Sequence, residues 1–354
     1  MSLLSEPASE TVKVFILAGQ SNMEGKGFPA PLSWQVSQPK YRERYTRFIH
    51  DGDYAGFTDT LRDSLNEDPK SPVYNWSIRE DVWVDYHDKH GDLTVGYTPR
   101  SDAFGPEFNF GQVMGDRYDE QVLIIKTSWG GKALGRGFLP PSLRDTPEEI
   151  KAIATAEEKT VEEIEKTHGE FYDLMVKEVN DALANIATNH PAYEGQGYEI
   201  IGFVWFQGFN DQFHPTYHAN YESNMAVFIN DIRSEWNVPD LPVVIGQMGQ
   251  NADKDGTYPV DREGFFTPAG NIRKAQADVA LRAEFNGTVT CVRTAPLWDM
   301  EADAIYNGPG GWQADVDKWR QFGDDRPYHY LGSPWFFAQV GTAFGEAMLD
   351  LIES

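Results

Sequence analysis

The sequence predicts a three-layer α/β/α fold with a five-stranded, mainly parallel sheet. Short apolar runs alternate along the chain with segments of helical period, and polar or glycine-rich residues directly follow several of these runs. Strands that alternate with helices form parallel sheets covered on both faces. The five expected strands are residues 12–17, 121–127, 198–206, 241–247 and 288–293.

The first of these runs, residues 12–17, ends abruptly at Ala18-Gly19-Gln20-Ser21. Glycine tolerates backbone angles that a side chain forbids, so Gly19 permits a sharp turn just past the strand. Ser21 would then lie at the carboxyl end of a strand and at the start of the next helix. Ligands bind at that edge of open α/β sheets. On this stretch alone, Ser21 is either an exposed nucleophile or a serine that caps a helix.

The segments between the strands differ in character. Residues 28–102 form a long excursion after the first strand, rich in Pro, Gly, Asp and Trp, with a hairpin expected from alternating runs at 81–87 and 93–97. Because structureless loops of this length are uncommon, we expect an ordered subdomain or active-site rim there. No repeat or linker divides the chain, which predicts one domain over 1–354 with this insertion. Helices are expected at 104–118, 147–189 (broken near 168–169), 217–236, 269–285 and 333–352, with a polar loop from 294 to 330.

Composition restricts the classes of partner. The chain has 30 basic and 55 acidic residues, and its net charge of −25 opposes binding to nucleic acid or an anionic membrane surface. A single cysteine, Cys291, excludes an internal disulfide. No run reaches the roughly 18 apolar residues of a membrane span. Residues 1–10 lack the basic and apolar parts of an export signal. We expect either a cytoplasmic protein or a secreted or periplasmic one whose signal has been removed.

Four polar segments should meet at one edge of the sheet. Ser21 follows the first strand, the pair Gly130-Gly131 follows the second, Asn210 follows the third, and His329 precedes the last helix. Acyl transfer needs a hydroxyl nucleophile, a base within hydrogen-bond reach and donors aimed at the oxyanion. Backbone N–H groups of glycine and the asparagine amide are donors that do not titrate near neutral pH. The set therefore predicts acyl-transfer chemistry.

These motifs resemble the SGNH (GDSL-like) hydrolase superfamily, and within it the carbohydrate-esterase branch of sialate O-acetylesterases and acetylxylan esterases. The resemblance rests on GQSNM at 19–23, KTSWGGKAL at 126–134 and WFQGFND at 205–211, supported by FGPEFNFG at 104–111. The matches extend from residue 12 to the last helix and are weakest in the 28–102 excursion. The resemblance implies a flavodoxin-like fold, no cofactor, no metal and an acetylated carbohydrate as substrate. It says nothing of the oligomeric state.

The resemblance also implies roles for individual residues. Ser21 matches the nucleophile and His329 the general base, while the oxyanion donors would be the N–H groups of Ser21 and Gly130 or Gly131 together with the Asn210 amide. Gln20, Gln207 and Arg326 are candidates for contact with substrate. One motif departs from the family pattern D-x-x-H, because Arg326 stands at the usual aspartate position. The acid partner of His329 would then be Asp325 or, alternatively, Asp324, unless a backbone carbonyl holds the imidazole in a Ser-His dyad.

Other readings stay open for several residues. We expect Asp211 and Glu107 to be structural. His214 and His218 have the i, i+4 spacing of a metal pair, but we do not expect a metal site because no third ligand is visible and Pro215 interrupts the helix. The whole chain could also be a carbohydrate-binding protein whose triad has decayed at Arg326. The aromatic residues Trp76, Trp83, Tyr86 and Tyr97 would either stack on sugar or pack the insertion.

The choice of sugar depends on charge. A sialic acid carries a carboxylate that the acidic protein would repel unless a basic pocket compensated. Candidate bases for such a pocket are Lys132, Arg136 and Arg326. A neutral polysaccharide needs only aromatic faces and hydrogen bonds. We therefore expect acetylated neutral sugars to be better substrates than O-acetylated sialic acid.

Overall fold

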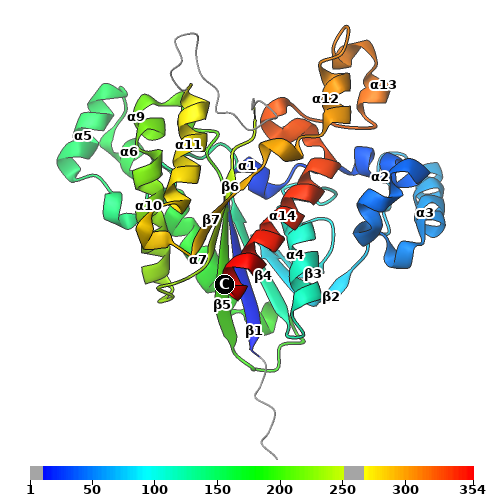
Figure 1. Cartoon of the computed structure of the whole chain (residues 1–354), viewed down its shortest axis with the longest axis horizontal. Coiled ribbons are helices and arrows are strands. Elements are labelled where there is room, and N and C mark those ends of the chain that lie inside the picture. Colours follow the sequence, from blue (N-terminus) through cyan, green and yellow to red (C-terminus); the bar gives the residue numbers. More distant parts are fainter. Residues whose placement is uncertain (1–10, 251–266) are drawn as a thin grey trace, which may run out of the picture.

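In the computed structural model, which describes residues 11–250 and 267–354, a seven-stranded sheet separates two layers of helices (Figure 1). The sheet order is β3-β2-β4-β1-β5-β6-β7, and every pair except β2–β3 is parallel. Of the five expected strands, the second (β4) lies on one side of the first (β1). The third, fourth and fifth (β5, β6 and β7) follow in turn on the other side of β1, which is a doubly wound order. The strands are β1 Val12–Gly19, β2 Arg79–Tyr86, β3 Lys89–Leu93, β4 Val122–Ser128, β5 Tyr198–Phe206, β6 Val243–Gln247 and β7 Val289–Arg293. The expectation about an export signal at residues 1–10 lies outside the described residues.

The strand count of five was wrong because the hairpin of the insertion joins the sheet. β2 pairs in parallel with β4, from Val82 opposite Val122 to Tyr86 opposite Lys126, and β3 forms the edge. The second strand of the hairpin is Lys89–Leu93 rather than 93–97, because the chain turns early, at His87, whose φ is 53°. Its sequence, KHGDL, has no strand-like alternation. Only the long-range pairing reveals it as a strand.

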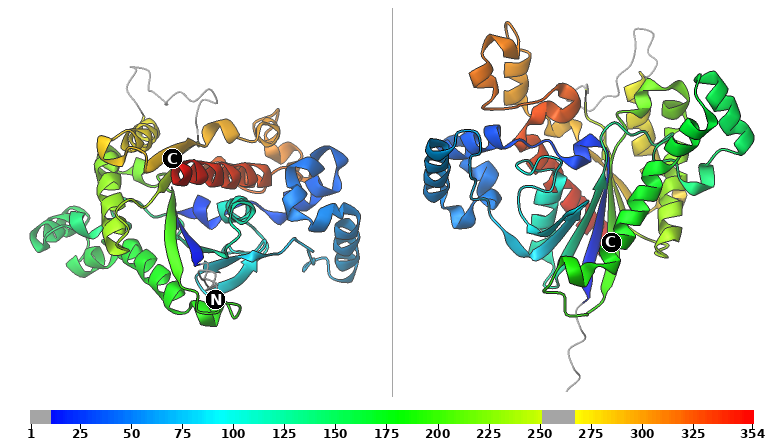
Figure 2. Two further views of the ribbon diagram at one scale, coloured as in Figure 1. Left: turned by 60° about the horizontal axis from the view of Figure 1, so that its bottom comes forward. Right: turned by 180° about the vertical axis from the view of Figure 1, so that it is seen from behind.

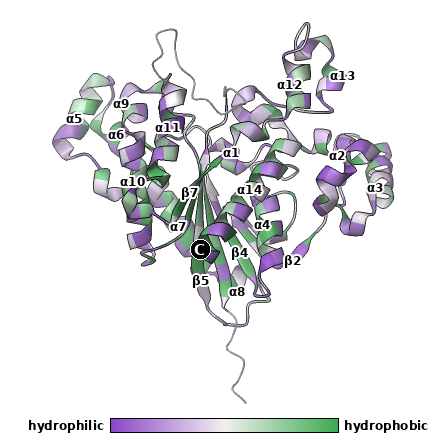
Figure 3. Ribbon diagram, viewed as in Figure 1, coloured by the Kyte–Doolittle hydropathy of each residue, from purple (hydrophilic) through white to green (hydrophobic). Residues whose placement is uncertain are grey.

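Each face of the sheet is covered by its own helices (Figure 2). Side chains alternate along β1, so that Phe15 and Leu17 pack with α4 and α14, whereas Val14 and Ile16 pack with α7, α10 and α11. Figure 3 shows the hydrophobic colour concentrated on the central strands between these layers. The covering helices are α4 Pro106–Arg117, α7 Glu170–Ala184, α10 Tyr221–Glu235, α11 Pro268–Ala280 and α14 Pro334–Glu353.

The insertion at 28–102 is ordered and packs against the same core as α4 and α14. Phe48 stacks on Phe108 with ring centroids 4.2 Å apart, and the ring of Tyr45 meets Trp335 edge-on. Its helices are α2 Pro29–Ser37, α3 Tyr54–Glu67 and the 3₁₀ helices η1 Pro39–Phe48 and η2 His50–Gly52. The organisation of the chain as one domain stays a prediction.

Several expected helices are divided, and one expected loop contains helices. The break at 168–169 is present, and a second break precedes Thr160, which caps α6. The loop expected at 294–330 contains α12 and α13, each begun by an aspartate, Asp299 or Asp315, that accepts backbone N–H groups. The remaining elements are α1 Ser21–Glu24, α5 Pro147–Ala156, α6 Val161–Thr167, α8 Ile186–Asn189, α9 Pro215–Ala219, α12 Met300–Tyr306, α13 Val316–Trp319, η3 Pro141–Leu143, η4 Asp211–Phe213, η5 Ala283–Phe285, η6 Ala295–Leu297, η7 Trp312–Ala314 and η8 Pro327–Gly332.

Within residues 11–250 and 267–354, none of the helices combines the length and apolar character needed to cross a bilayer.

The end of β1 offers a test of the fold. A Cβ atom at Gly19 would lie 2.2 Å from the carbonyl oxygen of Phe206, so Gly19→Ala forces β1 and β5 apart. We expect a loss of about 1–3 kcal/mol in the free energy of unfolding, measured by denaturant titration. Gly287→Ala is the matched control, because that glycine has φ of +78° but no atom within 4 Å of its Cβ position. A Gly19→Ala variant as stable as the wild type would contradict the close approach.

Candidate active site

The candidate site lies where three neighbouring strands end level with one another. Gly19 of β1 pairs with Ser128 of β4 on one side and with Phe206 of β5 on the other. The segments that follow these three residues carry the predicted chemistry. Because the strands are parallel and in register, the segments leave the sheet together at its carboxyl edge, where α/β sheets bind ligands.

Ser21 begins the short helix α1 and is 8% exposed. The glycine pair after β4 lies directly beside it, since a Cβ atom at Gly130 would be 3.5 Å from the Cβ of Ser21. Gly131 has a left-handed φ of 74°, and a Cβ there would be 4.0 Å from Nδ2 of Asn210. The structure thus brings together Ser21, both glycines and Asn210, and their roles in catalysis stay predictions.

Gln20 orients the amide of Asn210. Its Nε2 donates to Oδ1 of Asn210 at 3.0 Å, while its Oε1 accepts from the backbone N–H groups of Gly208 and Asn210 at 3.2 and 3.4 Å. Since Oδ1 is held by Gln20, the NH₂ group of Asn210 is turned to the opposite side. Gln20 itself is 2% exposed. Both ends of its amide are used to hold the loop 208–210, and its contact with substrate stays a prediction.

Asp211, the last residue of the motif WFQGFND, links that motif to the segment that follows β4. Its fully buried carboxylate accepts hydrogen bonds from the backbone N–H groups of Leu134 and Gly135, at 2.9 and 2.8 Å, and from Nε2 of Gln207 at 2.6 Å. Burial raises the pKa of Asp211 to about 6, even though these donors favour the charged form. This arrangement agrees with the structural role expected for Asp211.

The side chain of Gln207 is also bonded to protein partners. Its Nε2 donates to the carbonyl oxygen of Lys132 as well as to Asp211, and its Oε1 accepts from the hydroxyl of Tyr221 at 2.9 Å. Only 3% of the residue is exposed. The alternation of β5 continues past Phe206 and carries Gln207 inwards, and its contact with substrate also stays a prediction.

His329 has a carboxylate partner, although Arg326 stands at the expected position for one. Nδ1 of His329 is 2.8 Å from Oδ2 of Asp325, and the other oxygen of Asp325 accepts the N–H of Arg326. Burial raises the pKa of Asp325, but the hydrogen bond and charge of His329 and the Arg326 N–H together hold it below the ordinary value. Asp324 instead lies 4.0 Å from Arg100. Of the alternatives left open by the sequence, the contact with His329 is made by Asp325.

A strained turn presents this pair. Tyr330 and Leu331 both have positive φ, 50° and 65°, a conformation that is costly for residues with a Cβ. The carbonyl of Leu331 accepts from the N–H groups of Asp324 and Asp325, which closes the turn on itself. The buried hydroxyl of Tyr330 accepts from the N–H of Gly249. These contacts hold the strained backbone in place.

The histidine turn is joined to the nucleophile segment through one carbonyl. The oxygen of Tyr328 accepts from Nδ2 of Asn22 and from Nε2 of Gln250, both at 3.1 Å. The residue before His329 is thus bonded to the residue after Ser21. Sequence reasoning missed the role of Asn22. Its place in GQSNM was a signal, but nothing in a single sequence links position 22 to position 328.

A comparison with protein families identifies this set of motifs. The family described as carbohydrate esterase, sialic acid-specific acetylesterase matches residues 11–279, which is most of the chain. The chain belongs to this family. None of the curated proteins matches it.

One solved structure resembles this family member in fold, and two others align with it at lower scores. A protein from Arabidopsis thaliana is 14% identical, with a TM-score of 0.50, and the alignment covers 96% of this chain and 98% of that one. A carbohydrate acetylesterase from Xanthomonas citri is 13% identical, with a TM-score of 0.44 and coverage of 81% and 50%. NanS is 15% identical, with a TM-score of 0.40 and coverage of 86% and 83%.

The basic residues proposed near the site differ in their surroundings. The guanidinium of Arg326 packs over the ring of Trp312, 4.6 Å from its centroid, and Arg136 is paired with Glu157. Lys132 lies over the ring of Phe171. In this family member, Arg326 therefore has a partner other than His329.

The aromatic residues of the insertion are packed rather than offered to a ligand. Trp76, Trp83, Tyr86 and Tyr97 are at most 8% exposed. Trp83 stacks on His190, and Trp76 stacks on Tyr74. Of the two readings left open for these residues, packing is the one observed.

The two histidines considered for metal binding have other neighbours. His214 precedes α9, which begins at Pro215, and its ring stacks on Tyr217. Nδ1 of His218 lies 3.3 Å from the amide of Asn271. Across the described part of the chain, no group of three or more His, Cys, Asp or Glu residues is arranged to hold a metal ion.

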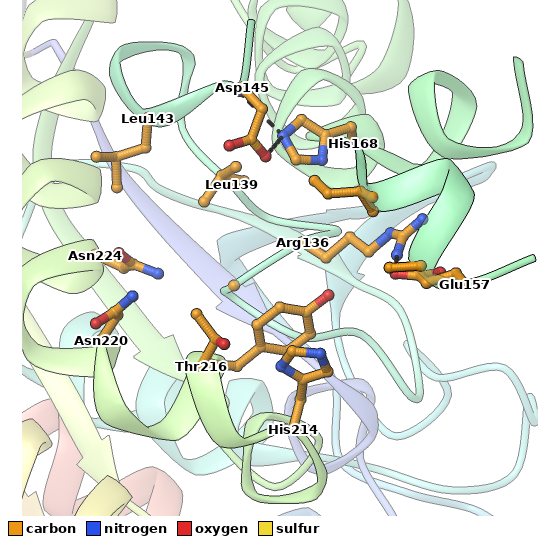
Figure 4. A pocket seen from close by; sticks show the side chains of 14 residues that line it. Arg136, Leu139, Leu143, Asp145, Glu157, His168, His214, Thr216, Asn220 and Asn224 are labelled. Atoms are coloured by element: carbon orange, nitrogen blue, oxygen red, sulfur yellow. Dashed lines mark hydrogen bonds and ion pairs between the residues drawn. The ribbon is translucent and has the colours of Figure 1, made fainter. Parts of the chain in front are cut away.

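Two cavities lie beside the loop that contains the glycine pair. Figure 4 shows the first, of about 500 Å³, with the contact between His168 and Asp145 on one side and Thr216 and His214 on the opposite side. The second, of about 520 Å³, has Gly131 in its wall, and we call it the Gly131 cavity. It is lined by Gly131, Lys132, Ala133, Arg136, Gly137, Lys159, Glu163, Lys166, Thr167, Glu170, Phe171 and Tyr217.

Exchange of the two neighbouring aspartates tests the acid partner of His329. Asp325→Asn should reduce kcat by roughly 10⁴-fold, because the amide favours the wrong histidine tautomer. Asp324→Asn should keep most of the activity, since that carboxylate faces Arg100. Steady-state hydrolysis of a small acetyl ester measures both. Equal activity of the two variants would remove Asp325 from the site.

Proposed function

We propose that this chain is a serine esterase that removes acetyl groups from a carbohydrate through an acyl-enzyme intermediate. One observation carries the proposal: the bond between Asp325 and His329 lies on a turn that is bonded, through Tyr328, to the residue beside Ser21. A nucleophile, a base and an orienting acid are thereby on neighbouring segments. Membership of a carbohydrate esterase family supports the same reaction class.

Each side chain has a defined task in this reaction. His329 accepts the proton of Ser21 as its hydroxyl oxygen attacks the ester carbonyl, and Asp325 stabilises the imidazolium that forms. The N–H of Ser21, a glycine N–H and the Asn210 amide hold the negative tetrahedral oxygen. Protonated His329 then gives its proton to the departing sugar hydroxyl. Water attacks the acyl-enzyme with the same help from His329 and releases acetate.

A small crevice is lined by the residues on either side of Ser21. This crevice of about 10 Å³ is lined by residues including Gln20, Asn22, Gln207 and Phe209. Such a volume holds about one water-sized group. The methyl of an acetyl group has about this size, although Ser21 itself does not line the crevice.

Replacement of the nucleophile tests the mechanism. Ser21→Ala should fold normally and lose roughly 10³–10⁶-fold in kcat, because no acyl-enzyme can form. Hydrolysis of a small acetyl ester measures the loss, and labelling by an active-site serine reagent followed by peptide mapping should identify Ser21 in the wild type. A variant that keeps more than about a tenth of wild-type kcat would refute the mechanism. A wild-type protein that neither hydrolyses esters nor reacts with the serine reagent would favour the alternative of a carbohydrate-binding protein whose triad has decayed.

A second proposal concerns the sugar, and two observations favour an acidic one over the neutral sugar expected from the sequence. The aromatic residues that would stack on a neutral polysaccharide are buried. The Gly131 cavity has four basic residues and two acidic ones on its walls, although the whole protein is strongly acidic. Among the described residues, neither Lys132 nor Lys166 forms an ion pair. Such a surface attracts a sugar carboxylate.

Salt dependence distinguishes the two classes of sugar. We expect kcat/KM to be higher for an O-acetylated sialic acid than for an acetylated neutral sugar, and to fall for the acidic substrate alone as salt rises, because salt screens exposed charges. Lys132→Ala together with Lys166→Ala should weaken that preference mainly through KM. Faster turnover of the neutral sugar at low and high salt would restore the original expectation.

A further inference from the structure

Glu24, the last residue of the nucleophile helix α1, reaches across to the glycine pair after β4. Its Oε1 accepts the backbone N–H of Gly130 at 2.6 Å, and its Oε2 accepts from Nζ of Lys26 at 3.1 Å. The Glu24 side chain is 13% exposed. A single carboxylate therefore links the helix that carries Ser21 to the loop that carries two candidate oxyanion donors.

A buried ion pair also holds the backbone of Glu24. The backbone oxygen of Glu24 accepts from Nζ of Lys126 at 2.8 Å, and the same ammonium group contacts Oε2 of Glu107 at 2.7 Å. Neither Lys126 nor Glu107 has an exposed side chain, and the N–H of Gly105 donates to the second oxygen of Glu107. Burial lowers the pKa of Lys126, while Glu107 opposes that shift. Glu24 is thus fixed through both its backbone and its side chain.

The bond from Glu24 separates the roles of the two glycines. An N–H that donates to a carboxylate at 2.6 Å is not available to an oxyanion, and the carboxylate would repel the negative charge there. Within the described part of the chain, no carboxylate accepts the N–H of Gly131. Its φ of 74° turns the chain, and a Cβ atom placed there would lie 4.0 Å from Nδ2 of Asn210. Gly131 is therefore the glycine placed to act together with Asn210.

We propose that Glu24 is a positioning residue of the oxyanion hole, which holds Gly130 so that Gly131 supplies the backbone N–H for the tetrahedral oxygen. This inference rests on the proposed acyl transfer and adds to it the choice of donor and the residue that sets its position. Glu24 touches neither substrate nor the reacting atoms. It acts through the peptide of the glycine pair.

Removal of the carboxylate should slow chemistry and spare binding. Without the bond the glycine loop relaxes, and displacement of a catalytic group by about 1 Å costs roughly 10²-fold in rate. We expect Glu24→Ala to lower kcat by about 10–100-fold with KM little changed. Glu24→Gln should recover most of the activity, because its amide oxygen still accepts the N–H of Gly130. Glu24→Asp, one methylene shorter, should resemble Glu24→Ala.

The experiment measures kcat and KM for these variants on a small acetyl ester, with melting temperatures to verify folding. Asn210→Ala is the benchmark for a lost donor and should cost roughly 10²–10³-fold in kcat. Asp53→Ala is the matched control, because Asp53 also accepts a backbone N–H, from Gly56, but in the α3 cap of the insertion. We expect its kcat to stay at the wild-type value.

Several results would overturn the inference. A faster Glu24→Ala variant would mean that Glu24 blocks Gly130 and that Gly130 is the donor. A Glu24→Gln variant as slow as Glu24→Ala would mean that the charge matters rather than the hydrogen bond, and a loss confined to KM would mean a role in binding. If Ser21→Ala is inactive while Glu24→Ala is normal, the serine mechanism stands and this inference alone fails. A wild type without ester hydrolysis would overturn both.

Discussion

The parallel register of β1 between β4 and β5 is the constraint on which the site depends. Because Gly19 is level with Ser128 and Phe206, the three loops that follow begin at one height and can exchange hydrogen bonds. The backbone at Gly19 approaches Phe206 so closely that no side chain fits. A shift of one residue in either pairing would turn every following side chain to the other face of the sheet. The chemistry of the loops therefore depends on packing in the sheet.

Buried polar groups then define each loop in turn. Asp211 and the pair of Lys126 and Glu107 carry charge into the protein interior, which is costly unless every partner is present. Such groups favour a single arrangement of their neighbours, because any displacement leaves a buried charge without its hydrogen bonds. The apolar core could tolerate many loop conformations. These contacts restrict them to one.

Much of this arrangement was accessible from the sequence, because local signals determine it. The five main strands follow from apolar runs, and the neighbourhood of Ser21, Gly131 and Asn210 follows from where those runs end. The features that could not be predicted depend on residues far apart in the sequence. The edge strand β3 has no pattern of its own, and the amide of Gln20 faces 208–210 only once β1 and β5 are paired. The choice between Asp324 and Asp325 depends on the left-handed backbone at 330–331, which composition does not predict.

The histidine turn has a consequence for how the site can change. Asp325 and His329 are four residues apart on one self-closed segment, whereas in many hydrolases of this chemistry the acid and base lie on separate loops. The acid–base pair is thus a module whose internal geometry does not depend on the rest of the site. The Tyr328 carbonyl joins it to Asn22 and Gln250, and the Tyr330 hydroxyl joins it to Gly249. Local opening of this segment would withdraw base and acid together and leave the nucleophile loop intact, so that the protein can be folded, able to hold a sugar, and inactive.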